Sequence, residues 1–474
     1  MENRIKAGLF GTGLDTYWDQ FKGLRDNLES YRRQIIERME AASEVEIVDG
    51  GMVDNPEKAV ETASLFAREQ VDIVFLYVAT YCLSSTILPV AQRLSCPLII
   101  LNLQPTPAID YNTINSLGDR ARMTGLWLEN CQACSIPEIA NVFNRSGLRY
   151  DIVTGYLADD IAWQQIREWL EAAKVYCGMR KNRMGILGHY YGGMLDVYTD
   201  LTLQSAVFGT HIEMLEMCEL DKYREQTTPQ EIEDKIAEFR IGFDVSDQCS
   251  EEELHRAART SLALDRMVDA HRLGSMAYYY EGESGNRYED IATSVIAGNT
   301  LLTGKGVPVA GECEVKNVQA MKMLSLLNAG GSFSEFYALD FNDDVVMLGH
   351  DGPAHFAIAE GRVGLVPLPV YHGKPGKGLS IQMRVRHGPV TLLSVCESRE
   401  GLFLLVAEGE SVEGPTLQIG NTNSRYRFRC GVRTFINAWS KAGPSHHCAV
   451  GVGHWSGTLE KTAFLLEIPF VKIG

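Results

Sequence analysis

Five side chains in the second half of the chain are of types that do chemistry: Glu312, Glu335, His350 and the doublet of His446 and His447. Carboxylate oxygens and imidazole nitrogens form a hard donor set, which suits Mn²⁺, Mg²⁺ or Co²⁺ better than a thiolate type of zinc site. Each residue alone also has an ordinary structural explanation, such as dipole stabilisation by a glutamate at a helix start. Their meeting around one cation is therefore a hypothesis, which spacing by itself does not establish.

Other chemistries lack their usual sequence signals. Gly8, Gly11 and Gly13 follow the first expected strand, but their spacing is not that of a dinucleotide fingerprint, so we predict a strand-ending turn and no nucleotide cofactor. The chain contains no P-loop lysine motif, nucleophile elbow or HExxH. Cys131 and Cys134 form the single CxxC pair among 11 cysteines, and no second pair completes a four-cysteine metal site. Reduced thiols are the simplest interpretation.

Composition excludes several classes of partner. The chain has 44 Lys and Arg against 61 Asp and Glu, which gives a net charge of −17. An acidic field of this size repels nucleic acid and anionic lipid, so we expect neither nucleic acid nor a membrane as partner. No signal-peptide pattern and no apolar stretch of about 18 residues is present. We therefore expect a cytoplasmic protein.

The side chains need a scaffold that brings them together. Apolar runs alternate with amphipathic helical stretches in the first third of the chain, which predicts a doubly wound parallel α/β domain over residues 1–175. The alternation resumes and predicts a second α/β domain over residues 176–328. Short β-rich runs separated by Gly and Pro then predict a mostly β, barrel-like domain over residues 329–474, with a strand at 464–468. In parallel sheets of this kind, ligands bind beyond the carboxyl ends of the strands.

Around the five side chains, the sequence resembles the L-arabinose isomerase family, which belongs with the L-fucose isomerases. The similar pieces are Ala310-Gly311-Glu312, Gly330-Gly331-Ser332-Phe333-Ser334-Glu335, Leu348-Gly349-His350, and Ser445-His446-His447 followed by Gly453-His454. The likeness is best over residues 300–474. It implies a metal-dependent aldose–ketose isomerase for a free pentose, hexose or deoxy sugar. It also implies a homo-oligomer, either a hexamer or a tetramer.

The resemblance implies specific roles for four of these residues. Glu312, Glu335, His350 and His447 would hold a divalent metal, typically Mn²⁺, and Glu312 and Glu335 would be the acid/base pair. Such an enzyme moves a proton between C1 and C2 of an open-chain sugar through an ene-diol, and the metal stabilises the negative charge that develops on the oxygens. Which histidine of the doublet is the ligand stays open, as does the preferred sugar.

The resemblance also suggests substrate contacts. Gln104 stands where the family carries a glutamine, and His446, Tyr17 and His189 are further candidates for contact with the sugar. Cys134 stands where the family typically has a substrate-contacting histidine, and a thiol does not replace an imidazole hydrogen bond. Two alternatives remain: a non-catalytic sugar-binding or regulatory paralogue on the same scaffold, or another metal-dependent sugar enzyme such as an epimerase.

Overall fold

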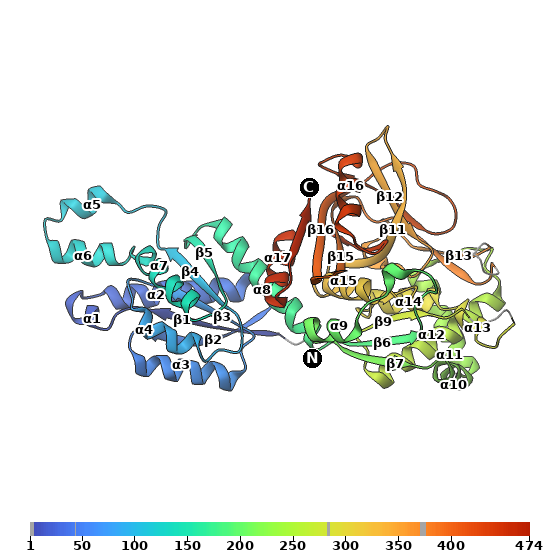
Figure 1. Ribbon diagram of the computed structural model, residues 1–474, viewed down its shortest axis with the longest axis horizontal. Helices are drawn as coiled ribbons and strands as arrows, with labels where there is room; N and C mark the ends of the chain where they lie inside the picture. The colour runs from blue at the N-terminus through green and yellow to red at the C-terminus, as the bar shows by residue number, and fades with distance from the viewer. Residues whose placement is uncertain (1–3, 43, 282–284, 370–375) are drawn as a thin grey trace. The chain divides into compact units, whose positions relative to one another are not determined.

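Buried aliphatic strands form a five-stranded parallel sheet in the first of two compact units, Met1–Cys177 (Figure 1). The computed structural model describes residues 4–42, 44–281, 285–369 and 376–474. The strand order β2-β1-β3-β4-β5 puts the topological switch point beside β1. The strands are β1 (Ile5–Thr12), β2 (Val45–Val53), β3 (Ile73–Val78), β4 (Leu98–Gln104) and β5 (Tyr150–Tyr156).

Amphipathic helices cover this sheet. Helices α3, α4 and α7 share one apolar core with it, in which Phe10, Phe66 and Phe143 are buried. The N-terminus of α3 is capped by Asn55, whose side chain accepts from the Lys58 N–H. The helices are α1 (Thr16–Gln20), α2 (Leu24–Ala42), α3 (Pro56–Glu69), α4 (Ser84–Ala91), α5 (Tyr111–Ser116), α6 (Arg120–Leu128), α7 (Gln132–Arg145) and α8 (Asp160–Arg180).

The second unit, Gly178–Gly474, begins with a smaller parallel sheet of order β10-β9-β6-β7. Its strands are β6 (Arg183–Gly188), β7 (His211–Leu215), β9 (Ser275–Tyr279) and β10 (Val309–Ala310). Because β6 pairs with β7 on one side and β9 on the other, the switch point lies beside β6. The connecting helices are η1 (Leu195–Val197), α9 (Leu201–Phe208), α10 (Met217–Glu225), α11 (Pro229–Gly242), α12 (Glu251–His271), α13 (Glu289–Ala292), α14 (Ile296–Gly304) and α15 (Val315–Leu326).

An antiparallel barrel completes the second unit. Its strands run in the order β15-β18-β11-β12-β17-β16, and pairing of β15 with β16 closes the ring. They are β11 (Gly330–Asp340), β12 (Val345–His350), β15 (Gly388–Ser398), β16 (Gly401–Val412), β17 (Thr422–Phe428) and β18 (His447–Val452). Helix α16 (Val432–Ala442) connects β17 to β18, and helix α17 (Ser456–Leu466) follows β18. The last strand, β19 (Phe470–Ile473), pairs in parallel with β16.

Three short strands form a separate small sheet of order β14-β13-β8. They are β8 (Asp244–Val245), β13 (Gly364–Pro367) and β14 (Leu379–Gln382), and η2 (Phe356–Ile358) precedes β13. Leu365 and Ile381 pair across this sheet and are fully buried, so it joins the apolar core that the barrel shares with α11, α12 and α14.

The fold class predicted from the sequence is confirmed: parallel α/β sheets are followed by a closed antiparallel barrel. The three domain boundaries stay a prediction, and the compact units part between Cys177 and Gly178. The strand predicted at 464–468 is wrong, because residues 464–466 end helix α17. The buried residues Leu459, Ala463 and Leu466 recur at helical spacing, and Glu467 ends the helix in the left-handed conformation. Among the described residues, no helix is both long and apolar enough to cross a bilayer.

Candidate functional site

One wall of the site is the carboxyl edge of the parallel sheet in the second unit. Glu312 follows β10, and its backbone is held by neighbouring loops: its carbonyl accepts from the Tyr191 N–H at 3.3 Å, and Cys313 N–H donates to the Tyr278 carbonyl at 2.9 Å. Glu312 and Cys313 have φ values of 56° and 58°. A left-handed conformation costs a residue with a side chain about 1 kcal/mol or more, so the turn around Glu312 is strained. Strain of this kind is typical of functional sites.

The opposite wall comes from three adjacent barrel strands. Glu335 lies on β11, where it pairs with Gly349 of β12 on one side and His447 of β18 on the other. His350 is the next residue after Gly349 and ends β12. Strand pairing therefore brings together residues that are far apart in the sequence.

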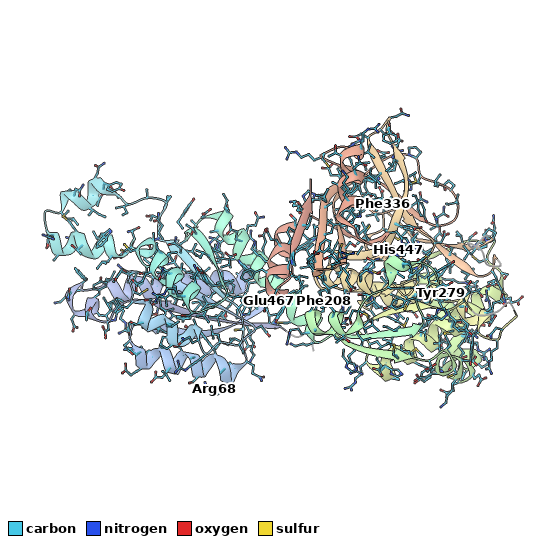
Figure 2. The ribbon with its side chains drawn as sticks, in the orientation of Figure 1. Arg68, Phe208, Tyr279, Phe336, His447 and Glu467 are labelled. Atoms are coloured by element: carbon cyan, nitrogen blue, oxygen red, sulfur yellow. The ribbon has the colours of Figure 1, made fainter. Side chains whose placement is uncertain are left out.

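An aromatic ring packs against both imidazoles of this wall. The ring centroid of Phe333 lies 4.4 Å from that of His350 and 4.3 Å from that of His447. His447 is fully buried, at 0 % exposure. Figure 2 labels His447 together with Tyr279, which ends β9 on the opposite wall. The packing fixes both imidazole rings before any ligand arrives.

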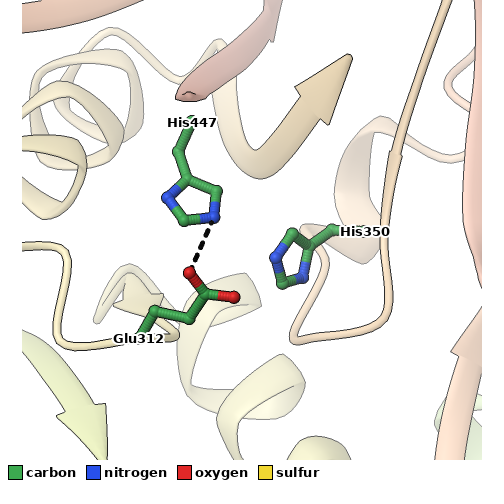
Figure 3. A group of neighbouring side chains, drawn as sticks. All are labelled: Glu312, His350 and His447. Atoms are coloured by element: carbon green, nitrogen blue, oxygen red, sulfur yellow. Dashed lines mark ion pairs between the residues drawn. The ribbon is translucent and has the colours of Figure 1, made fainter. Parts of the chain in front are cut away.

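The predicted metal ligands converge. Glu312, His350 and His447 place one ligand-type atom each within 4.8 Å of one another, and so do Glu335, His446 and His447. Figure 3 shows the first group, with Oε2 of Glu312 at 3.4 Å from Nε2 of His447. His447 belongs to both groups. Nε2 of His446 also lies 3.4 Å from Oε2 of Glu312, so both histidines of the doublet face this carboxylate.

The charges of the site influence one another. Burial acts to raise the pKa of Glu312, but the hydrogen bond from His446 and the positive field of His447 and His350 together hold it below its usual value. Burial acts to lower the pKa of His446, but hydrogen bonds to Glu312 and Asp196 raise it to about 9. Nδ1 of His446 lies 2.6 Å from Oδ2 of Asp196, which also accepts the backbone N–H of His446.

Several buried polar atoms suit a bound cation. Both ring nitrogens of His447 make no hydrogen bond within the described part of the chain, and burial without one is costly. Oxygen and imidazole donors are what Mn²⁺ and similar cations accept. Nδ1 of His350 accepts from the Gly352 N–H at 2.8 Å. Since a metal-bound imidazole keeps a proton on its other nitrogen, binding through Nε2 of His350 would require this contact to open.

The site opens into a cavity of about 110 Å³. Glu312, Glu335 and His350 line one side of it, and Tyr191 and Tyr279 line another, with their ring centroids 4.6 Å apart. Burial and the neighbouring phenol and carboxylate groups raise the pKa of Tyr279, so its hydroxyl stays protonated. The cavity thus combines charged groups with an aromatic face.

The other predicted substrate contacts belong to other elements of the chain. His189 is exposed after β6, 5.5 Å from the Tyr279 ring, and does not line the cavity. Gln104 ends β4 in the first unit, where its Nε2 donates to the Thr106 carbonyl at 2.8 Å. Tyr17, in α1 of the same unit, packs edge-on against Phe21. Cys134 is exposed in the first turn of α7. Sugar contacts through Gln104, Tyr17 and His189 stay predictions.

Sequence analysis missed several residues of the site. Asp196, which holds His446, lies in η1 and has no distinguishing sequence context. Glu314 is fully buried behind His447, and its place two residues after Glu312 is the one signal that could have drawn attention to it. Tyr279 belongs to a tyrosine-rich run whose role was not predicted, whereas Tyr191 lies in the 189–193 loop, which the sequence offered with His189 as a candidate for the pocket.

The comparisons with known proteins agree with part of this picture. A family model described as the L-arabinose isomerase C-terminal domain matches residues 330–469, which include Glu335, His350 and His447. None of the curated proteins compared with the chain matches it. One similar solved structure is an ABC transporter periplasmic solute binding protein from Actinobacillus succinogenes 130z with bound D-allose. It is 13 % identical, over 65 % of this chain and 78 % of that chain, with a TM-score of 0.18. The C-terminal match supports the resemblance of this chain to an arabinose/fucose isomerase-like family.

Proposed function

We propose that the protein is a metal-dependent aldose–ketose isomerase that acts on a free pentose, hexose or deoxy sugar. The main support is that Glu312, Glu335 and His350 line one cavity and that His447 belongs to both groups of neighbouring ligand-type side chains. These donors suit a divalent cation and include two carboxylates for proton transfer. The C-terminal family match supports the same class of reaction.

Glu312, Glu335, His350 and His447 would hold the cation. A bound Mn²⁺, or Mg²⁺ or Co²⁺ in its place, supplies positive charge that stabilises the oxygens of an ene-diol. Oδ2 of Asp196 contacts both the backbone N–H and Nδ1 of His446, and these two contacts orient the ring toward Glu312. His446, with a pKa of about 9, is protonated at neutral pH. Its Nδ1 is held by Asp196, so it would donate to a sugar hydroxyl through Nε2, in exchange for the contact of this nitrogen with Glu312.

The reaction moves two protons. In the aldose-to-ketose direction the first proton moves from C2 to C1, and the second moves from O2 to O1. Glu312 stays ionised at neutral pH because its pKa lies below the usual value, so it can accept the proton from C2 and return it to C1. Glu335 is the proposed second carrier, which serves the oxygens. Tyr191 and Tyr279 offer an aromatic face to the carbon side of the sugar and help to exclude water.

A panel of aldoses assayed by NMR in D₂O tests the proposal. Ketose is expected to form with Mn²⁺, to stop forming after EDTA treatment, and to form again when Mn²⁺ is restored. Formation of an epimeric aldose would instead indicate an epimerase, and binding of sugar with no product would indicate a sugar-binding protein.

Glu312→Gln tests the catalytic base. Turnover is expected to fall by about 10²-fold or more, because an amide does not accept the proton, while the melting temperature stays close to that of the wild type. Glu408→Gln is the matched control, since Glu408 lies on β16 outside the cavity and pairs with Lys472 at 2.9 Å. Retained activity in Glu312→Gln would end the assignment of Glu312 as the base.

A further inference from the structure

A buried pair of charges lies behind His447, away from the cavity. Glu314 is 0 % exposed and Lys316 is 2 % exposed. Neither carboxylate oxygen of Glu314 makes a hydrogen bond within the described part of the chain, and the cavity lining does not include this residue. A carboxylate taken fully out of water is costly unless nearby positive charge compensates it. Two basic side chains lie beside this carboxylate: Nζ of Lys316 at 3.5 Å and Nδ1 of His447 at 3.6 Å.

His447 lies between two carboxylates. Its Nε2 is 3.4 Å from Oε2 of Glu312, which lines the cavity, and its Nδ1 is 3.6 Å from Oε2 of Glu314, which does not. An ionised carboxylate accepts hydrogen bonds and donates none. Nδ1 is the ring nitrogen that lies beside Glu314, so this carboxylate attracts a proton to Nδ1, and the Nε2 lone pair then faces the cavity side.

Lys316 links Glu314 to the segment that carries Asp196 and Tyr198. Its Nζ donates to the carbonyls of Asp196 at 2.6 Å and Tyr198 at 3.2 Å, and it lies 3.5 Å from Oε1 of Glu314. The side chain of Asp196 in turn holds His446. The ammonium group of Lys316 thus contacts both Glu314, which lies beside His447, and Asp196, which holds His446.

We propose that Glu314 is a positioning residue: its carboxylate, held by Lys316, keeps a proton on Nδ1 of His447 and so directs the Nε2 lone pair toward the cation proposed at Glu312. The inference rests on the proposed function, and it adds a residue that touches neither substrate nor cation. Carboxylates behind metal-bound histidines fix the tautomer and raise the basicity of the ring, and their loss typically costs 10- to 100-fold in metal affinity.

The tautomer of His447 is measured directly by NMR on ¹⁵N-histidine-labelled full-length protein. The chain has 11 histidines, and the His447 signals are assigned by their loss in His447→Gln. With diamagnetic Mg²⁺ bound, the wild type is expected to carry the proton on Nδ1. Glu314→Asp, which keeps the charge, is expected to keep that tautomer, whereas Glu314→Gln is expected to lose the strict preference because an amide both donates and accepts.

Mn²⁺ affinity, measured by calorimetry without sugar, is the second readout. Glu314→Gln is expected to bind Mn²⁺ about 10- to 100-fold more weakly than the wild type, while Glu314→Asp stays much closer to it. Glu408→Gln controls for the loss of a carboxylate from the barrel and is expected to bind Mn²⁺ normally.

The outcomes separate this inference from the proposed function. A proton on Nε2 of metal-bound wild-type His447, or unchanged Mn²⁺ affinity in folded Glu314→Gln, would overturn the positioning role even in an active isomerase. If Glu314→Gln does not fold, loss of the Nδ1 proton in Glu314→Asp would overturn it. Tight Mn²⁺ binding with the expected tautomer but no ketose from any aldose would overturn the isomerase proposal alone.

Discussion

Two glycines near the imidazoles show how closely the backbone approaches the site. A Cβ added at Gly352 would lie 2.9 Å from Nδ1 of His350, closer than carbon and nitrogen approach without displacement. A Cβ added at Gly311 would meet Phe333 at 3.5 Å and His350 at 4.0 Å, which are ordinary contacts. Neither glycine has a positive φ, so the backbone itself tolerates alanine at both positions. The two positions therefore differ mainly in what they do to His350.

This difference gives a residue-scale prediction. Gly352→Ala is expected to push the His350 ring away from the added methyl group and to weaken Mn²⁺ binding by about tenfold or more, because a displaced ring presents its nitrogen poorly to the cation. Gly311→Ala, the matched control in the same cavity, is expected to bind Mn²⁺ within a few-fold of the wild type. Calorimetric titration of both variants measures the effect. Equal affinities would show that His350 is not a ligand, or that its ring tolerates the displacement.

At the scale of elements, a histidine joins the end of one helix to a strand and a second helix. His271 is the last residue of α12, and its ring nitrogens lie 2.6 Å from Oε1 of Glu213 on β7 and 2.8 Å from Oε1 of Glu219 on α10. Hydrogen bonds to Glu219 and Glu213 raise the pKa of His271, against a smaller opposing effect of burial. A cation at a helix C-terminus also interacts favourably with the helix dipole.

The pH dependence of stability follows from the direction of this shift. A histidine whose pKa is higher in the folded state contributes fully below its unfolded value of about 6.5, and the contribution is lost as pH rises through the folded pKa. His271→Gln is expected to lower the free energy of unfolding by about 1 kcal/mol at pH 6, a typical size for such a pair, and by much less at pH 9. Urea denaturation at both pH values measures it, with the exposed His211→Gln on β7 as control. A loss that does not shrink at pH 9 would contradict the charge-based explanation.

Elements with strong local patterns were predictable from the sequence. Continuous aliphatic runs such as β3 are buried on both faces and form central parallel strands, as expected. The run at 464–468 was assigned to a strand because a short apolar run does not by itself distinguish a strand from a buried helix, and α17 proved to contain its first three residues. The sequence also offered Glu312, Glu335, His350 and His447 as candidate ligands, and their metal binding stays a prediction.

Properties set by tertiary pairing were not predictable. The register that places Glu335 opposite His447 depends on β11 and β18, which are far apart in the chain, and no local pattern encodes it. The same holds for Asp196, whose contact with His446 joins η1 to the residue that precedes β18. Glu314 was missed for another reason: a buried carboxylate reveals its role only when its neighbours are known.

At the scale of the whole molecule, the proposed metal ligands and two of the predicted sugar contacts belong to different compact units. The four proposed metal ligands all lie in Gly178–Gly474, whereas the predicted sugar contacts Gln104 and Tyr17 lie in Met1–Cys177. A ligand that binds only the folded state stabilises the unit that binds it, by about 2.7 kcal/mol at 100 times its Kd. The cation alone should therefore protect Gly178–Gly474, and protection that also reaches Met1–Cys177 should require a sugar that contacts Gln104 and Tyr17.

Hydrogen exchange followed by mass spectrometry measures this division. Mn²⁺ alone is expected to slow amide exchange in peptides from β11, β12 and β18, and to leave peptides of Met1–Cys177 unchanged. A substrate aldose added with Mn²⁺ is expected to protect the peptide that contains Tyr17 and the peptide that contains Gln104 as well. His447→Gln, which removes the ligand common to both groups, should abolish the Mn²⁺ effect and so serves as control. Sugar-dependent protection confined to Gly178–Gly474 would remove Tyr17 and Gln104 from the substrate site, because a residue in contact with bound sugar shares in its stabilisation.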